Sequence, residues 1–168
     1  YEKLLPPLVS KIRKEVKAWR DNRYEGASVT SKALLSWWFH TEHILPKSDG
    51  NMFEFQYYFA QREATETVIY LYEVVKVKDK YDLIRYDSSG AVSTGMFDEE
   101  WLRLVVKMAT GSGKTKVMSL IITWCYFHKR YEADSRLSTN FLVIAPNIIV
   151  LDRLRADFDG LKIFWNDP

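Results

Sequence analysis

The 168-residue sequence predicts an α/β fold, in which a parallel sheet is flanked by helices. Two apolar runs, residues 104–108 and 141–145, are expected to form strands of such a sheet. The second run is continuously apolar, as is typical of a strand buried on both faces, whereas the first contains Lys107. Each run is followed by a helical pattern, so strand and helix alternate after residue 104. Residues 161–165 are expected to begin a third strand.

The composition is that of a folded domain. Hydrophobic residues make up 47% of the chain and aromatic residues 15%, which provides a sizeable core and excludes wholesale disorder. The net charge of +2 does not by itself mark a nucleic-acid-binding protein, so any such binding must depend on local patches. The single cysteine, Cys125, cannot form an internal disulfide and is expected to fill the core of a protein in a reducing cytosol. No apolar run reaches the roughly 18 residues of a membrane span, and no signal peptide opens the chain.

The glycine loop, which we define as residues 108–115 with the sequence Met-Ala-Thr-Gly-Ser-Gly-Lys-Thr, lies between the first strand and its helix. Strand, glycine-rich loop and helix in this order are the context that a phosphate-binding P-loop requires. Gly111 and Gly113 have no Cβ, so the backbone can turn its N–H groups toward phosphate oxygens. Lys114 is expected to reach the β- and γ-phosphates, and the Thr115 hydroxyl to bind Mg²⁺. The general P-loop pattern begins with glycine, whereas this loop begins with methionine.

An amphipathic helix over residues 4–20 and a second, shorter helix over residues 31–39 are expected upstream, and they form a helical extension over residues 1–52. The basic side chains of the first helix either contact nucleic acid or form an ordinary solvated face, and the acidic residues among them favour the solvated face. Residues 46–51, rich in Gly, Ser and Asp, predict a linker, and a domain boundary is expected between the extension and the rest of the chain.

An aromatic segment, residues 53–64, follows the linker. Its rings either fill the core or stack on a nucleobase, whose edge the Gln61 amide can read because an amide both donates and accepts hydrogen bonds. A helix is expected over residues 64–77, with a strand as the competitor because many residues there are β-branched. Residues 81–86 are expected to form a short strand, and the acidic triplet 98–100 to cap a short helix or to be solvated.

The helix after the glycine loop is expected to run to about Tyr131. A second helix, over residues 148–158, is expected to be capped by Asn147 and stopped by Gly160. Ligands of open parallel sheets bind beyond the carboxyl ends of the strands, where both the glycine loop and Pro146-Asn147 are expected to lie.

Together these motifs resemble the first part of a superfamily 2 helicase or translocase of DEAD/DEAH type, and most closely the Res subunit of type III restriction enzymes. Residues 108–115 resemble motif I of that family, whose first residue is not always glycine. Phe-Ala-Gln-Arg-Glu-Ala at 59–64 is similar to the family's adenine-reading segment. Ala-Pro-Asn at 145–147 resembles motif Ia, although the family usually has threonine after the proline. The resemblance covers about residues 53–168.

The resemblance implies a RecA-like ATP-binding domain whose first part is residues 53–168, with ATP and Mg²⁺ as cofactors. Lys114 and Thr115 would be the catalytic residues, and Thr115 would also bind Mg²⁺. Phe53 or Phe59 would lie near the adenine ring. The other residues implied to contact the nucleotide are Gln61, Thr110, Gly111, Ser112 and Gly113. Those implied to contact the backbone of DNA are Pro146, Asn147 and Arg153.

Backbone contacts carry no sequence information, so the resemblance further implies that a methyltransferase subunit recognises the DNA site. The family's Asp-Glu-x-His motif and second RecA-like lobe do not occur here. We therefore expect an N-terminal fragment of an ATP-hydrolysing DNA helicase or translocase, cytoplasmic in a bacterium or archaeon, that does not hydrolyse ATP alone. An accompanying endonuclease domain is left open. The alternatives are an RNA helicase, another P-loop enzyme such as a small-molecule kinase, and a nucleic-acid-binding module with an inactive nucleotide site.

Overall fold

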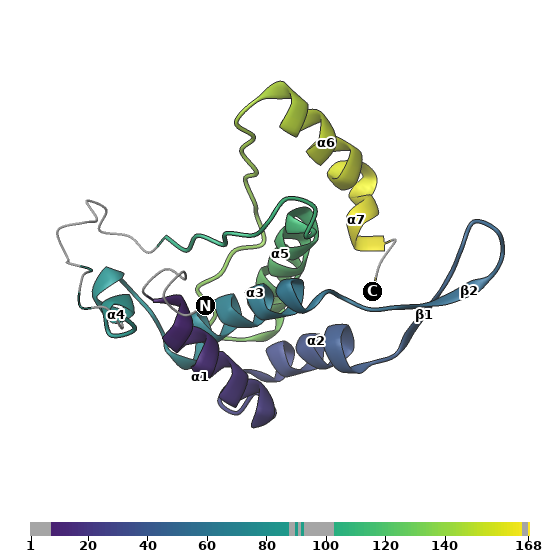
Figure 1. The fold of residues 1–168 in the computed structure, drawn as a ribbon. Helices are drawn as coiled ribbons and strands as arrows, with labels where there is room; N and C mark the ends of the chain where they lie inside the picture. The colour runs from purple at the N-terminus through teal and green to yellow at the C-terminus, as the bar shows by residue number, and fades with distance from the viewer. Residues whose placement is uncertain (1–7, 88–89, 91, 93–102, 166–167) are drawn as a thin grey trace. The chain divides into compact units, whose positions relative to one another are not determined.

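The structure is a computed structural model that describes residues 8–87, 90, 92, 103–165 and 168 (Figure 1). The chain divides into two compact units that alternate along the sequence. The first unit consists of residues 1–27 and 63–107, and the second of residues 28–62 and 108–168. The division into domains at residues 52 and 53 stays a prediction, and the acidic triplet 98–100 lies outside the described residues.

The first unit is helical. It contains α1 (Val9–Asp21), most of α3 (Phe59–Ile69), a π-helical turn η2 (Tyr70–Val74) and α4 (Lys80–Ile84). The helix predicted over 4–20 is confirmed for the described part, and helix rather than strand is confirmed for most of 64–77. Among the described residues, one buried hydrophobic cluster of this unit combines side chains from α1 and from the segment after α3: Ile12, Val16, Leu71, Val77 and Tyr86.

A buried ion pair joins α1 to α3 inside this unit. The Glu66 side chain is fully buried, and both of its oxygens accept hydrogen bonds from Arg20 Nε, at 2.8 and 3.0 Å. Arg20 Nη2 also donates to Glu66 Oε2, and the Tyr24 hydroxyl donates to Oε1 at 2.7 Å. The hydrogen bond to Glu66 raises the pKa of the Arg20 guanidinium above its usual value. Because a buried carboxylate without a partner is costly, this arrangement fixes the two helices against each other.

The strand predicted over residues 81–86 is wrong, because α4 occupies that segment. The Asp79 side chain accepts hydrogen bonds from the backbone N–H groups of Tyr81 at 2.8 Å and Asp82 at 3.2 Å. Such an N-cap satisfies two donors at once and starts a helical turn. Over so short an apolar run, periodicity alone cannot distinguish strand from helix.

The second unit combines helices with one antiparallel hairpin. In the hairpin, His43 pairs with Phe55 and Leu45 pairs with Phe53. Of the predicted linker 46–51, Pro46 is the last residue of β1, and residues 47–51 form the turn that connects the two paired strands. The elements are α2 (Val29–His40), β1 (His43–Pro46), β2 (Met52–Phe55), α5 (Lys114–Tyr131), α6 (Ile148–Phe158), a 3₁₀ turn η4 (Asp159–Leu161) and α7 (Lys162–Trp165).

Helix α2 packs on α5 through buried polar contacts. Trp124 Nε1 of α5 donates to the Ser31 hydroxyl of α2 at 2.7 Å, and both side chains are buried. The residue before Ser31 also contacts this helix pair, because the backbone N–H of Thr30 donates at 3.0 Å to the carboxylate of Glu132, the C-cap residue of α5. These bonds place α5, which carries the glycine loop at its start, against a second helix of the same unit.

Burial raises the pKa of the Cys125 thiol to about 11. The thiol is therefore expected to stay protonated at neutral pH, and thiolate is the reactive form. We expect iodoacetamide to label Cys125 slowly in the folded protein at pH 7.5, and at the rate of a free thiol in urea. Labelling equally fast under both conditions would show that the thiol is not protected by the fold.

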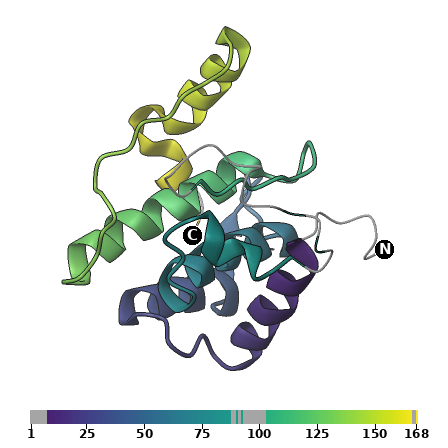
Figure 2. The same ribbon diagram turned by 90° about the vertical axis from the view of Figure 1, so that its left-hand side faces the viewer.

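The predicted parallel sheet is not confirmed. Among the described residues the hairpin is the one sheet, and the apolar runs 104–108 and 141–145 are drawn as loops in Figures 1 and 2. Both runs are exposed where burial was expected, with Val105 at 88% and Leu142 at 85%. A parallel strand is stable only with neighbouring strands and with helices on both faces, and a sheet of fewer than three strands is marginal. Neither run has such a neighbour among the described residues.

The third strand predicted over residues 161–165 is also wrong, because α7 begins at Lys162. Gly160 and Leu161 lie in the left-handed region with φ of 67° and 59°, and they separate α6 from α7. The helix predicted over 148–158 and its stop at Gly160 are confirmed. In the described part of the chain, no helix is both long and apolar enough to cross a membrane.

Candidate functional site

The glycine loop leads directly into α5, as predicted. Gly111 and Gly113 have φ of 81° and 80°, values in the left-handed region that favours glycine. Gly113 is the N-cap of α5 and has no side chain with which to cap it, so the first N–H groups of this 18-residue helix remain available as donors. Together with the positive end of the helix dipole, they make the loop a place where an anion is stabilised.

Lys114 folds back over the loop. Its ammonium donates to the backbone carbonyls of Ala109 at 3.0 Å and Met108 at 3.3 Å. These acceptors are neutral, and a charged phosphate oxygen is a stronger acceptor for an ammonium group. The ammonium is thus held at the loop and can exchange its carbonyl bonds for a phosphate. The Thr115 side chain, partly exposed in the first turn of α5, follows directly.

Gln61 lies against the glycine loop. Its side chain is only 7% exposed, and its Oε1 accepts a hydrogen bond from the backbone N–H of Tyr58 at 2.8 Å. A Cβ added to Gly113 would lie 2.1 Å from Gln61 Nε2, so the amide fills the space that a side chain would take. The residue predicted to read adenine and the loop predicted to hold phosphate therefore meet, although they are distant in the sequence. Sequence reasoning missed Tyr58, because a backbone N–H leaves no side-chain signal.

Two glycine variants, one at Gly113 and one at Gly111 as its control, test this contact. Gly111→Ala and Gly113→Ala both place a Cβ at a left-handed position, at a cost of about 1–2 kcal/mol in free energy of unfolding. A Cβ on Gly111 has nothing within 4 Å, whereas one on Gly113 meets Gln61. We expect Gly113→Ala to be more destabilising in urea unfolding, and Gln61→Ala to reduce that excess when the two are combined. Equal losses from the two glycine variants would mean that Gln61 does not occupy this space.

The residues predicted to contact nucleic acid lie on a different segment. Pro146 and Asn147 are exposed, and Arg153 is exposed on α6. The Asn147 side chain accepts from the backbone N–H of Val150 at 3.0 Å, which confirms its predicted role as the cap of α6. Its amide NH₂ remains able to donate to a phosphate. In the described part of the chain, no hydrogen bond or ion pair joins these residues to the glycine loop. Their role toward DNA stays a prediction.

The two aromatic residues predicted to lie near the adenine ring, Phe53 and Phe59, belong to different elements of the fold. Phe59 opens α3 and is 56% exposed, two residues before Gln61. Phe53 lies in β2 of the hairpin, where the Lys47 ammonium sits 5.9 Å from its ring centre. Within the described residues, no group of three or more His, Cys, Asp or Glu side chains could hold a metal ion.

A helicase-like nucleotide-binding function is supported at the level of the protein family. Residues 54–165, more than half of the chain, match the family described as type III restriction enzyme, res subunit. The chain belongs to this family. No curated protein and no solved structure matches it.

Proposed function

We propose that this chain is the nucleotide-binding part of an ATP-driven DNA translocase of the restriction type, with a RecA-like parallel sheet in the full-length protein. The observation that carries the proposal is the contact between Gln61 and Gly113. It joins an amide able to read a base edge to a loop able to hold phosphates, and one ligand that presents both groups is a purine nucleotide.

The residues fit ATP and Mg²⁺. The two left-handed glycines and the first N–H groups of α5 suit a chain of phosphates, and the Lys114 ammonium lies within the loop to pair with the β- and γ-phosphates. The Thr115 hydroxyl would bind Mg²⁺, which supplies charge neutralisation of the phosphates. Thr110 and Ser112 would contribute backbone N–H groups to the same cradle.

DNA would contact Pro146, Asn147 and Arg153 through its phosphates, and recognition of the site would belong to a methyltransferase partner. The exposure of all three residues supports this assignment. The sequence contains no Asp-Glu-x-His motif after the glycine loop, so we expect the chain by itself to bind ATP without turning it over.

The test is ATP turnover by the full-length protein, measured with no nucleic acid, with duplex DNA, with single-stranded DNA and with RNA. The proposal expects turnover that duplex DNA stimulates most. Stimulation by RNA alone would identify an RNA helicase. Phosphate transfer to a small molecule would identify a kinase, and no turnover with retained DNA binding would identify an inactive nucleotide site.

A further inference from the structure

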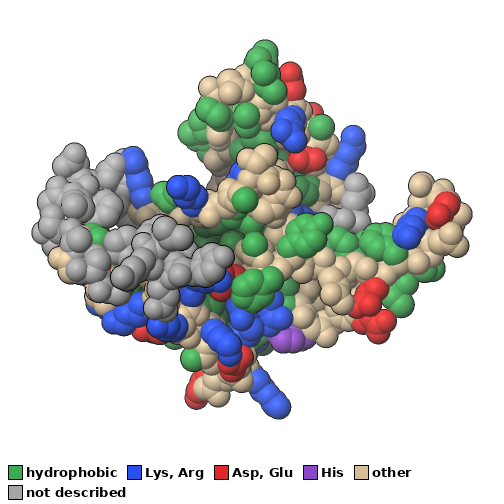
Figure 3. All heavy atoms as spheres, in the orientation of Figure 1, with side chains coloured by type: hydrophobic (Ala, Val, Ile, Leu, Met, Phe, Trp, Pro, Cys, Tyr) green, Lys and Arg blue, Asp and Glu red, His purple; other side chains and the backbone are tan. Residues whose placement is uncertain are grey.

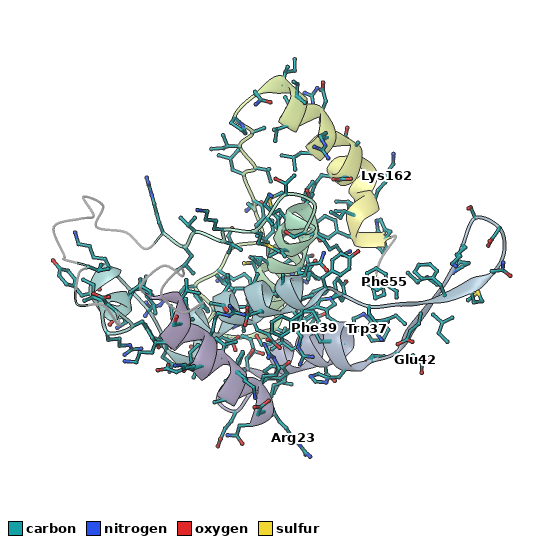
Figure 4. All side chains as sticks on the ribbon, in the orientation of Figure 1. Arg23, Trp37, Phe39, Glu42, Phe55 and Lys162 are labelled. Carbon is teal, nitrogen blue, oxygen red and sulfur yellow. The ribbon has the colours of Figure 1, made fainter. Side chains whose placement is uncertain are left out.

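A cavity of about 390 Å³ lies in the second unit, where the last turn of α2 meets the end of β2 and the first turn of α3. Its walls come from residues 38–42, from residues 54–57 and from Arg62. Figure 4 shows Phe39, Glu42 and Phe55 near the base of the hairpin. The lining includes neither Gln61 nor the glycine loop, so the cavity is not accounted for by the proposed nucleotide site.

One wall of the cavity is aromatic. The rings of Phe39 and Phe55 meet the Tyr57 ring in edge-to-face geometry, with centroid distances of 5.5 and 4.9 Å. The buried Trp38 completes this wall. An aromatic ring carries negative charge density on its face, so an aromatic wall attracts cations and packs well against their methylene groups.

The charged groups of the cavity also favour a cation. The one guanidinium in the lining, that of Arg62, is already engaged, because Nη2 donates to His40 Nε2 at 3.0 Å and the group stacks 5.4 Å from the centre of the Phe39 ring. The lining also contains two carboxylates, those of Glu42 and Glu54. The Glu54 carboxylate accepts a hydrogen bond from Gln56. The Glu42 carboxylate has no hydrogen bond or ion pair to any described residue.

Figure 3 shows acidic side chains beside hydrophobic ones at the base of the hairpin. We propose that this cavity binds a basic side chain, arginine or lysine, presented by a partner protein. The methylene stem packs on the aromatic wall, and the charged head pairs with Glu42 and Glu54. The volume lies in the lower part of the range of small-ligand sites, roughly 300–1,000 Å³, and suits the end of one long side chain. An anionic ligand is disfavoured, because the carboxylates outnumber the engaged guanidinium.

The test uses the full-length protein and the probe N-acetyl-arginine N-methylamide, with binding followed by calorimetry or by NMR shifts. Its neutral counterpart is N-acetyl-citrulline N-methylamide, which keeps the shape and removes the charge. We expect saturable binding of the arginine probe and at least tenfold weaker binding of the citrulline probe. We expect the double variant Glu42→Gln and Glu54→Gln to weaken the arginine probe by tenfold or more. The control Asp152→Asn, an exposed acid on α6, should leave binding unchanged.

Three results would overturn the proposal. Equal binding of the arginine and citrulline probes would show that charge is not recognised. Binding of free arginine, with no binding of the capped probe, would indicate an amino-acid site instead of a docking site. Competition between ATP and the arginine probe would assign the cavity to the nucleotide. The folding of each variant is checked by its thermal midpoint, so a lost signal is attributed to the site only when that midpoint is kept. The double variant is expected to keep its ATP turnover, because Glu42 and Glu54 lie outside the proposed nucleotide site. Failure of this proposal can therefore be distinguished from failure of the proposed function.

Discussion

Replacing Lys114 by alanine in the full-length protein is expected to lower DNA-stimulated ATP turnover by orders of magnitude. Phosphoryl transfer depends on positioning and on neutralising the charge of the phosphates, so the loss of one cation at the β- and γ-phosphates removes a large part of the catalysis. The structure places this ammonium inside the loop, on the carbonyls of Ala109 and Met108. The measurement is the steady-state rate at saturating ATP and DNA.

The matched control is Lys32→Ala, which removes an exposed lysine of α2 in the same unit. It should leave turnover within twofold of the unaltered protein. Because Lys114 is exposed and its hydrogen bonds go to its own loop, Lys114→Ala should also keep the thermal midpoint. Unchanged turnover in Lys114→Ala would contradict the assignment of the loop to ATP, and with it the proposed enzyme. An equal loss in both variants would point to a general effect of lowering the positive charge.

The sequence predicted the helices well, because their determinants are local. Apolar residues at helical spacing located α1, α5 and α6, and the Asn147 cap marked the start of α6 correctly. The left-handed glycines of the loop and the helix start at Lys114 were likewise encoded within a few residues. These features need no distant partner to form.

The strands were predicted poorly for the opposite reason. An apolar run is recognised from the sequence, but its burial depends on strands and helices elsewhere, and runs 104–108 and 141–145 lack them among the described residues. The hairpin was missed although its signal was present. Gly50, with φ of 83°, and the Asp49 side chain, which accepts from the N–H of Asn51 at 2.9 Å, form a turn between two short apolar segments. That turn was interpreted as a linker.

The candidate site, too, could be predicted from the sequence only in part. The sequence identified Gln61 and the glycine loop separately, each from its own motif. Their contact depends on tertiary structure and was found only from the space that Gln61 fills beside Gly113. The aromatic and acidic cavity had no motif at all, because its walls come from three elements that only the folded chain brings together.

Removing the guanidinium of Arg20 is expected to destabilise the first unit strongly. Arg20→Ala leaves the Glu66 carboxylate buried with the Tyr24 hydroxyl as its remaining partner among these three residues. Breaking a buried ion pair in this way costs about 3–5 kcal/mol in free energy of unfolding. The measurement is urea unfolding followed by tryptophan fluorescence, since the buried Trp19 lies in the same unit and on the same helix.

Arg13→Ala is the control on the same two helices. Arg13 pairs with Glu63 at 3.0 Å, but 43% of its side chain is exposed, and such a pair contributes less than about 1 kcal/mol. If Arg20→Ala and Arg13→Ala cost the same free energy of unfolding, burial does not determine the strength of the Arg20–Glu66 pair.

The variant Arg20→Lys distinguishes the contribution of the positive charge from that of the planar guanidinium geometry. A lysine keeps the charge and cannot donate from a planar fork to both carboxylate oxygens, so we expect a loss intermediate between the other two. A loss as large as that of Arg20→Ala would mean that the fork geometry, more than the charge, stabilises the buried Glu66.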